Sequence, residues 1–148
     1  MKEISHLGVY GIILEDKRIL LIKKNGGPYD GKLDLPGGTI EFIERPEETL
    51  FREIEEEVGI KIINYALFDV DSINYNWKHK GDLLNCKHIG IFYLIDKYDG
   101  VIKNDLKIDN INDDSKGAEF YKIENLKKYQ LSEIAILELE KFGYKILN

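Results

Sequence analysis

The chain has 148 residues and a formal net charge of −6, and 43% of its residues are hydrophobic. This length corresponds to a single domain, residues 1–148, that can bury a substantial core. The acidic balance argues against nucleic acid or an anionic membrane as a partner, because both attract a basic surface.

Cysteine usage and the N-terminal segment bear on the cellular location. Cys86 is the single cysteine, so an intramolecular disulfide is excluded and a cytoplasmic location is the default expectation. The apolar run near the N-terminus, residues 7–14, is followed by acidic residues and has no cleavage pattern of small residues. We therefore expect neither a signal peptide nor a membrane-spanning helix.

The first expected strands lie at residues 6–14 and 18–23, where Val, Ile and Leu are frequent. A short polar segment separates them, which predicts a β-hairpin. Lys23 and Lys24 end the second strand, and a loop rich in glycine follows at residues 25–31. The two lysines are candidate substrate-binding residues for phosphate, although lysines at a strand end more often serve solubility.

A fixed pattern of glycine, glutamate and arginine follows. Its members are Gly38, Glu44 after five intervening residues, and then, after seven more, Arg52, Glu53, Ile54, Glu56, Glu57, Gly59 and Ile60. At average composition, seven fixed and two apolar positions match by chance on the order of one time in a million. The pattern is therefore a specific signal.

The second half of this pattern predicts a helix over residues 46–58. Pro46 suits the first helical position, and Gly59 suits a left-handed C-terminal cap. At about 100° per residue, one quadrant collects the residues expected to reach the core, namely Leu50, Phe51, Ile54 and Val58. The adjacent quadrant collects three carboxylates, those of Glu53, Glu56 and Glu57.

Three carboxylates at this spacing repel one another, so we expect a cation among them. Mg²⁺, with Mn²⁺ as a substitute, takes oxygen ligands and binds through carboxylates plus substrate phosphates. The pair Gly37-Gly38 lets the backbone approach a metal or a phosphate closely, and Arg52 would orient the ligands. The alternative is a solvated acidic helix face, which the glycine pair and the fixed offsets of Glu44 and Arg52 argue against.

The middle of the chain is rich in β-forming residues. We expect residues 61–77 to form one bulged strand or two strands, residues 79–87 a loop, and residues 87–98 a central strand that pairs with the preceding segment. Tyr75 and Trp77 are expected to pack in the core or the hairpin rather than to stack on a base.

Ordinary structural roles are also expected for the three histidines, His6, His79 and His88, which lack metal-ligand spacing. Residues 99–117 are expected to form a loop, with a weak strand over residues 101–108 as the alternative. A final strand is expected over residues 117–123. A C-terminal helix, residues 132–142, should be capped by Ser132 and stopped at Gly143.

Because the spaced pattern is complete, the chain is similar to the Nudix hydrolases, and in particular to small single-domain members such as the MutT proteins. The resemblance is specific over residues 31–60, and the expected order of elements follows that of the family. Phe120 and Leu33 stand where the family often has Trp. These differences concern substrate stacking rather than the chemistry.

The resemblance implies an α/β fold, an α/β/α sandwich with a central mixed sheet. It also implies a divalent-metal-dependent pyrophosphohydrolase that cleaves a nucleoside diphosphate linked to another group, by water attack at phosphorus. The small-molecule substrate would be a nucleoside triphosphate or a nucleotide sugar such as ADP-ribose. The alternative is a catalytically silent module that keeps the fold and senses a nucleotide.

Roles are carried over from the family position by position. Glu53 and Glu57 would be the main metal ligands, with the Gly38 carbonyl as an additional ligand. Arg52 and Glu44 would hold the ligand helix in place. The general base is left open between three carboxylates, in the order Glu56, which could instead be a metal ligand, Asp114 and Glu119. Residues 61–97 could supply the face of a homodimer.

Overall fold

The structure is a computed structural model that describes residues 1–103 and 115–148. The elements in these ranges are β1 (Lys2–Ile12), β2 (Leu14–Glu15), β3 (Arg18–Lys24), β4 (Leu33–Asp34), β5 (Gly37–Thr39), α1 (Pro46–Val58), β6 (Lys61–His79), β7 (Asp82–Asp99), β8 (Ser115–Lys122), the 3-10 helices η1 (Ile123–Asn125) and η2 (Lys128–Gln130), and α2 (Glu133–Lys141). No helix in the described ranges is long and apolar enough to cross a membrane.

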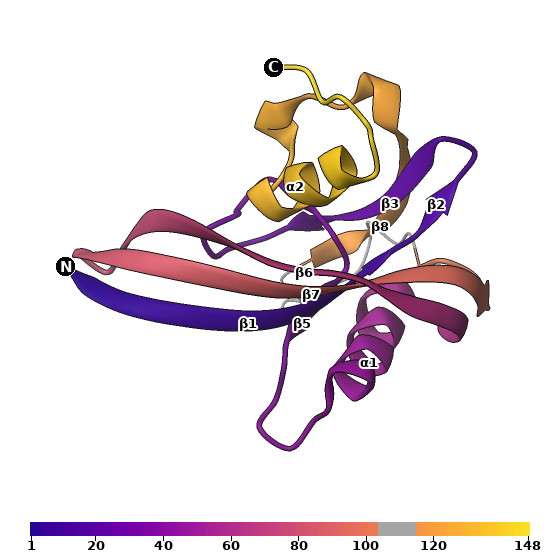
Figure 1. Cartoon of the computed structure of the whole chain (residues 1–148), viewed down its shortest axis with the longest axis horizontal. Helices are drawn as coiled ribbons and strands as arrows, with labels where there is room; N and C mark the ends of the chain where they lie inside the picture. Colours follow the sequence, from indigo (N-terminus) through magenta and orange to yellow (C-terminus); the bar gives the residue numbers. More distant parts are fainter. Residues whose placement is uncertain (104–114) are drawn as a thin grey trace.

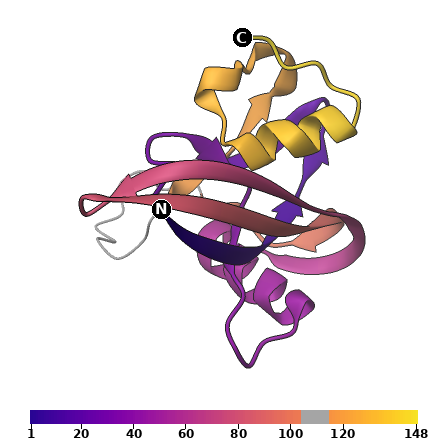
Figure 2. The same cartoon turned by 60° about the vertical axis from the view of Figure 1, so that its left-hand side comes forward.

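The strands form two sheets. The first has the order β5-β1-β7-β6 and is mixed, because β1 runs parallel to β7 while the other pairs are antiparallel. In the second sheet, β3 pairs antiparallel with β2, β4 and β8. The helices lie on opposite sides of the sheets, α1 on one side and α2 on the other (Figure 1; Figure 2). The expected α/β/α sandwich with a mixed sheet is therefore confirmed.

The strand β3 contributes to both hydrophobic cores, one on each face of its sheet. Ile19 and Leu21 belong to the core under α2, whereas Leu20 and Ile22 belong to the core under α1. Successive side chains of a strand point to opposite faces, so a continuous apolar run is what a strand covered on both faces requires.

The helix α1 begins at Pro46 and ends at Val58, as predicted, and Gly59 caps it in the left-handed conformation with φ 80°. The predicted core face is confirmed for three residues, because Leu50, Ile54 and Val58 are fully buried. The prediction was wrong for Phe51, which is 40% exposed and packs edge-on against Tyr65 with ring centroids 5.2 Å apart. Phe51 lies at the edge of the buried face of α1, where its ring packs on Tyr65 and remains partly in solvent.

The predicted first hairpin is only partly correct. The turn is where it was expected, since Leu14 pairs with Ile19 across the left-handed residues Asp16 and Lys17. The long preceding strand β1, however, leaves this hairpin and pairs with β5 and β7 in the other sheet. The hairpin therefore consists of β2 and the start of β3.

The expected loop over residues 79–87 was wrong. The strands β6 and β7 form one long antiparallel hairpin whose turn is Lys80-Gly81, both residues with positive φ. The positive φ values correspond to a two-residue hairpin turn, which is compatible with the right-handed twist of the strands. The expected bulges and the pairing of these segments are confirmed, and β7 is an internal strand of its sheet.

The C-terminal part matches its prediction closely. The strand β8 is followed by α2, whose N-cap Ser132 accepts a hydrogen bond from the Ala135 N–H through its hydroxyl group. Most of the alternative strand over residues 101–108, and the candidate base Asp114, lie outside the described residues.

Candidate active site

One arginine organises the charged side chains of α1. Arg52 donates from Nε to Glu44 Oε2 at 2.7 Å and from Nη2 to Glu44 Oε1 at 2.9 Å, a paired contact with one carboxylate. Its Nη1 donates to Glu53 Oε1 at 2.9 Å. The hydrogen bonds from Arg52 lower the pKa of Glu44 to about 2. Glu44 and Arg52 thus hold each other in place, and Arg52 also holds Glu53.

The glycine pair before α1 approaches two of its carboxylates. Gly37 donates its backbone N–H to Glu57 Oε1 at 2.7 Å. A Cβ atom at Gly38 would lie 2.6 Å from the carboxyl carbon of Glu53, much closer than carbon atoms can approach. A side chain at Gly38 would therefore collide with Glu53, whereas one at Gly37 would collide with the neighbouring strand β1, because its Cβ atom would lie 2.1 Å from the Val9 carbonyl oxygen.

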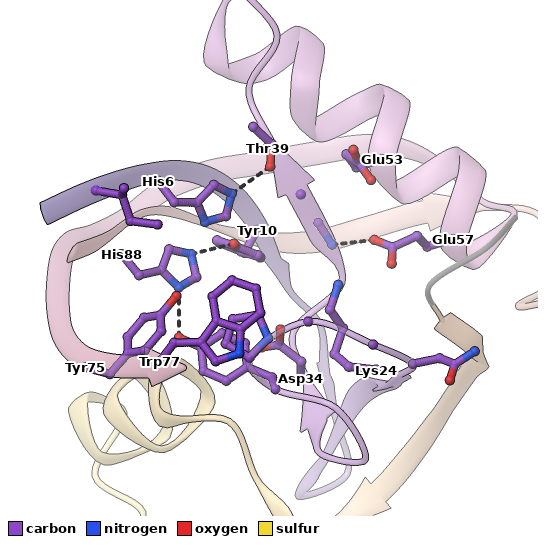
Figure 3. A pocket seen from close by; sticks show the side chains of 18 of the residues that line it. His6, Tyr10, Lys24, Asp34, Thr39, Glu53, Glu57, Tyr75, Trp77 and His88 are labelled. Carbon is purple, nitrogen blue, oxygen red and sulfur yellow. Dashed lines mark hydrogen bonds between the residues drawn. The ribbon is translucent and has the colours of Figure 1, made fainter. Parts of the chain in front are cut away.

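These groups form one wall of a cavity of about 540 Å³ (Figure 3). The acidic wall carries Glu53 and Glu57 beside the backbone of β5. Across the cavity lies a second wall that is mainly aromatic, drawn from β1, β6, β7 and the loop after β3, and made of Tyr10, Tyr29, Tyr75, Trp77, His6 and His88. Lys24 and the glycine-rich loop lie between the two walls.

Hydrogen bonds join three side chains of the aromatic wall. The Tyr10 hydroxyl lies 2.6 Å from His88 Nε2, and the Tyr29 hydroxyl lies 3.0 Å from His88 Nδ1. His6 packs beside His88 with ring centroids 4.6 Å apart and an interplanar angle of 34°, and it contacts Thr39 Oγ1 through Nε2 at 2.6 Å. Four members of the aromatic wall, Tyr10, Tyr29, His6 and His88, therefore form one connected set of side chains.

Burial shifts the protonation of both walls. It raises the pKa of Glu57 well above the usual carboxyl value, against the opposing effect of the Gly37 hydrogen bond. Burial, followed by the nearby His6 and Lys24, lowers the pKa of His88 to about 4. The His88 imidazole is therefore neutral at pH 7.

Asp34 connects the cavity to α2. It is 2% exposed, and its Oδ1 accepts hydrogen bonds from the Ser132 hydroxyl at 2.6 Å and from the Leu35 N–H at 2.8 Å. Burial raises the pKa of Asp34, and the hydrogen bond from Ser132 opposes this shift. The residue borders the same cavity, so the N-terminus of α2 is anchored at the site.

The structure brings most of the predicted site residues together. Gly38, Glu53, Glu57, Arg52 and Lys24 all line the cavity. Glu44 does not line the cavity, but it binds Arg52, which does. The residue Lys23 does not line the cavity, since neighbouring residues of β3 point to opposite faces.

The candidates for the general base lie farther out. Glu56 does not line the cavity; its side chain is 60% exposed and its Oε2 lies 3.5 Å from Arg52 Nη1. Glu119 is exposed on β8 and accepts a hydrogen bond from the Tyr121 hydroxyl. The predicted roles of these two carboxylates stay predictions.

The sequence interpretation missed the aromatic wall. His6, His88, Tyr75 and Trp77 were expected to have ordinary packing roles, yet all four line the cavity. Their sequence neighbourhoods carry no signal, because β1, β6 and β7 meet only in the folded sheet. Asp34 did carry a signal, as a lone acidic residue between the apolar Leu33 and Leu35.

The donors on the acidic wall suit a hard divalent cation. Two carboxylates, those of Glu53 and Glu57, line the cavity there beside Gly37 and Gly38, and Mg²⁺ typically binds through one or two carboxylates plus substrate phosphates. Within residues 1–103 and 115–148, no three carboxylate, histidine or cysteine side chains are placed to hold a metal ion by themselves. A metal here would therefore share its coordination with the substrate.

Comparison with known proteins gives consistent matches. The NUDIX domain model matches residues 4–142. The ADP-ribose pyrophosphatase of Methanocaldococcus jannaschii is 34% identical over 132 residues, covering 89% of this chain and 70% of that protein. The 8-oxo-dGTP diphosphatase of Escherichia coli is 31% identical over 93 residues, covering 61% of this chain and 65% of that protein.

A solved structure agrees with these matches. A MutT NUDIX hydrolase from Burkholderia pseudomallei has a TM-score of 0.72 and 26% identity to this chain, covering 93% of this chain and 97% of that one. The family model spans well over half of the chain, and the glycine pair, Arg52 and the glutamates of α1 have the arrangement described above. The chain therefore belongs to the Nudix family and is a MutT-like Nudix hydrolase.

Proposed function

We propose that the protein is a divalent-metal-dependent pyrophosphohydrolase that cleaves the diphosphate linkage of a nucleotide by water attack at phosphorus. One observation carries the proposal: Glu53, Glu57 and the glycine backbone lie in the same cavity as an aromatic wall. A nucleotide has a diphosphate and a flat base, and these two walls match its two ends.

The metal would be Mg²⁺, with Mn²⁺ as a substitute, held by Glu53, Glu57 and the Gly38 carbonyl. When bound, such an ion neutralises charge on phosphate oxygens and lowers the pKa of a bound water. Two contacts within the protein do the positioning. Arg52 holds Glu53, and the Gly37 N–H holds Glu57, so that neither carboxylate has to be ordered when the substrate binds.

Lys24 is proposed as a contact for the substrate phosphates. It lies between the acidic and aromatic walls (Figure 3), where a diphosphate would pass. For the general base, Glu56 remains the first proposal, because it lies on the same helix as both proposed ligands, and Glu119 is the described alternative. Since Glu56 is held beside Arg52 in the structure, its use as a base requires a change of side-chain rotamer.

ADP-ribose is our first proposed substrate, and nucleoside triphosphates are the second. The order follows the relatives, since the ADP-ribose pyrophosphatase matches a larger share of this chain than the 8-oxo-dGTP diphosphatase does. ADP-ribose and 8-oxo-dGTP, the compounds in the names of these two relatives, are both purine nucleotides with a diphosphate linkage, so the same chemistry would serve either.

The homodimer and the cytoplasmic location stay predictions. The strand β6 is an edge of its sheet and exposes Ile63, Leu67 and Val70. This apolar edge is where a second copy of the chain would pair. Sedimentation of the full chain at several concentrations tests the dimer.

A substrate panel tests the proposed activity. The full chain is incubated with ADP-ribose, ATP, dGTP, 8-oxo-dGTP, NADH and a dinucleoside polyphosphate, with Mg²⁺, with Mn²⁺ and with EDTA, and the products are separated by chromatography. We expect cleavage of a diphosphate bond in at least one substrate, lost in EDTA. Nucleotide binding without turnover under every condition would contradict the proposal and favour the silent sensing module.

A further inference from the structure

The aromatic wall contains a histidine that uses both of its ring nitrogens. His88 Nε2 faces the Tyr10 hydroxyl at 2.6 Å, and His88 Nδ1 faces the Tyr29 hydroxyl at 3.0 Å. A neutral imidazole has one N–H donor and one bare nitrogen acceptor. Because His88 is neutral at pH 7, one of the two tyrosines must donate to it and the other must accept from it.

The surroundings of Tyr10 decide which tyrosine donates. Tyr10 is 4% exposed, and in residues 1–103 and 115–148 its hydroxyl makes this one hydrogen bond. If Tyr10 accepted from Nε2, its own hydroxyl hydrogen would be buried without an acceptor, which native proteins avoid. Tyr10 therefore donates to Nε2, and the ring hydrogen of His88 lies on Nδ1.

The position of the Tyr10 hydroxyl is built into β1. A Cβ atom at Gly8 would lie 2.3 Å from this oxygen, so only glycine leaves room for the ring above it. Gly8 and Tyr10 belong to one strand that pairs directly with the strand of His88. The contact between Tyr10 and His88 is thus fixed by the register of β1 and β7 and not by a mobile loop.

The consequence appears at Tyr29. Its oxygen accepts the hydrogen from His88 Nδ1, and its own hydroxyl hydrogen has no acceptor among the described residues. Tyr29 is partly exposed and lines the same cavity as Glu53 and Glu57. The hydroxyl group is therefore a donor at the border of the cavity, with its oxygen held by His88.

We propose that Tyr29 is a specificity-determining residue that donates a hydrogen bond to an acceptor atom of the substrate's purine base. The proposal rests on the proposed function, which places the diphosphate at the acidic wall and hence the base at the aromatic wall. Tyr75, whose ring centroid lies 5.8 Å from that of Tyr29, borders the same space. A purine offers the required acceptors as ring nitrogens or, in guanine, as the carbonyl oxygen O6.

The tautomer of His88 gives a first test that needs no substrate. The full chain is labelled with ¹⁵N-histidine, and NMR correlates each ring nitrogen with the ring protons; the signals of His88 are assigned by their loss in His88→Gln. We expect a neutral ring with its hydrogen on Nδ1. A hydrogen on Nε2, or a ring that is charged at pH 7, would overturn the proposal.

The second test removes the donor and the acceptor in turn. Starting from the best purine substrate of the panel, kcat/KM is measured for that nucleotide and for its 1-deaza, 3-deaza and 7-deaza analogues; for a guanine nucleotide, the 2-aminopurine analogue that lacks O6 is added. We expect Tyr29→Phe to lower kcat/KM by about 10-fold, mainly through KM, since a contact remote from the reacting phosphorus affects ground state and transition state alike.

The decisive outcome is non-additivity. With the unmodified protein, one analogue should have a kcat/KM about as low as that of the parent nucleotide with Tyr29→Phe. With Tyr29→Phe, this analogue and the parent nucleotide should have the same kcat/KM. The exposed Tyr129 provides the matched control, and Tyr129→Phe should leave every value unchanged. The proposal would be contradicted if Tyr29→Phe lowered kcat/KM by the same factor for the parent nucleotide and all of its analogues, or if it did not lower kcat/KM at all.

The same comparison separates this inference from the proposed function. If no nucleotide is cleaved, the dissociation constants of the same nucleotides and analogues are measured by calorimetry with both tyrosine variants. A non-additive loss in affinity would then support the role of Tyr29 while the hydrolase proposal fails. An unchanged affinity in Tyr29→Phe would contradict the role of Tyr29.

Discussion

At the scale of single residues, the backbone of Gly38 lies directly against the carboxyl group of Glu53. Arg52 holds that carboxyl from the other side at 2.9 Å, so it has little freedom to move away. The site therefore depends on the absence of a side chain at Gly38 as much as on the charged residues around it.

Gly38→Ala should reduce activity far more than stability. Its Cβ atom would lie 2.6 Å from the Glu53 carboxyl and would push it out of place, and a displacement of about 1 Å in an active site can cost about 100-fold in rate. The value of φ at Gly38 is not in the left-handed region, so the backbone itself accepts alanine. We expect kcat to fall by about 100-fold with a change in Tm of only a few degrees, as measured by steady-state kinetics and calorimetry. Unchanged kcat in a folded variant would contradict this role.

The residues that could be predicted from sequence are those whose partners are near in sequence. Arg52, Glu44 and Glu53 lie within about two turns of one helix and its preceding loop, so spacing alone brings them together. Tyr10 and His88, in contrast, are 78 residues apart. Their contact depends on the parallel register of two strands, which composition and periodicity do not reveal.

At the scale of elements, Ser132 has two roles. Its hydroxyl group caps α2 by accepting from the Ala135 N–H, and it donates to the buried Asp34. Ser132→Ala removes the cap and also removes the hydrogen bond that the Ser132 hydroxyl donates to the buried carboxyl group of Asp34. We expect the free energy of unfolding to fall by about 2 kcal/mol, as measured by urea denaturation. Ser5→Ala, at an exposed position of β1, is the control and should cost little; equal stability of the two variants would contradict this account.

A buried acid also links α2 to β6. Glu138 on α2 is 1% exposed, and neither of its carboxyl oxygens has a hydrogen-bond donor among the described residues. Burial and the neighbouring Asp69 raise the pKa of Glu138 to about 8. Lys141 bridges Asp69 and Asp71 at 2.5 Å and 2.6 Å. A protonated Glu138 can donate a hydrogen bond to Asp69, whereas an ionised Glu138 would be repelled by the negative charge of Asp69 in a buried environment.

The stability of the protein should therefore fall as the pH rises from the ordinary carboxyl pKa to about 8, because in this range the carboxyl group of Glu138 is ionised in the unfolded chain but not in the folded protein. A carboxyl group with a raised pKa in the folded state stabilises it fully below the ordinary pKa, and this contribution is lost as pH rises to about 8. In Glu138→Gln the side chain stays neutral, so the variant should gain stability relative to the unmodified protein between pH 6.5 and 8, by up to about 1.4 kcal/mol per pH unit. Denaturation in urea at several pH values measures the difference.

The control for this prediction lies on the same helix. Glu140 is exposed, and Glu140→Gln should follow the pH dependence of the unmodified protein. A constant difference in stability between Glu138→Gln and the unmodified protein from pH 6.5 to 8 would show that Glu138 is already ionised in the folded protein in this range, and would contradict the raised pKa.

Element boundaries were predictable where a local stop signal exists. Pro46 and Gly59 fix both ends of α1, and Ser132 fixes the start of α2. The turn at Lys80-Gly81 was missed because charged and polar residues flank Leu83-Leu84 on both sides and make the segment look like a loop. Its pairing with β6, not its composition, makes this segment a strand.

At the scale of the whole molecule, the sandwich follows from the family pattern more than from local periodicity. The parallel pairing of β1 with β7 joins strands far apart in the chain and completes the mixed sheet. The two cores on its faces hold α1 and α2 in place. The cavity forms where this sheet meets the loop after β3, so the fold places an acidic helix opposite an aromatic sheet surface (Figure 3).

The central claim is that the carboxylates of α1 that face the cavity support nucleotide cleavage. The most direct measurement compares kcat/KM for the best substrate at saturating Mg²⁺ in Glu57→Gln and in Glu55→Gln. The second variant is the control, because it replaces a carboxylate by an amide at an exposed position of the same helix. We expect Glu57→Gln to lose about 100-fold or more, because removing a metal ligand should cost at least as much as removing its supporting partner. Glu55→Gln should stay within about twofold. Equal activity of the two variants, both folded, would contradict the account.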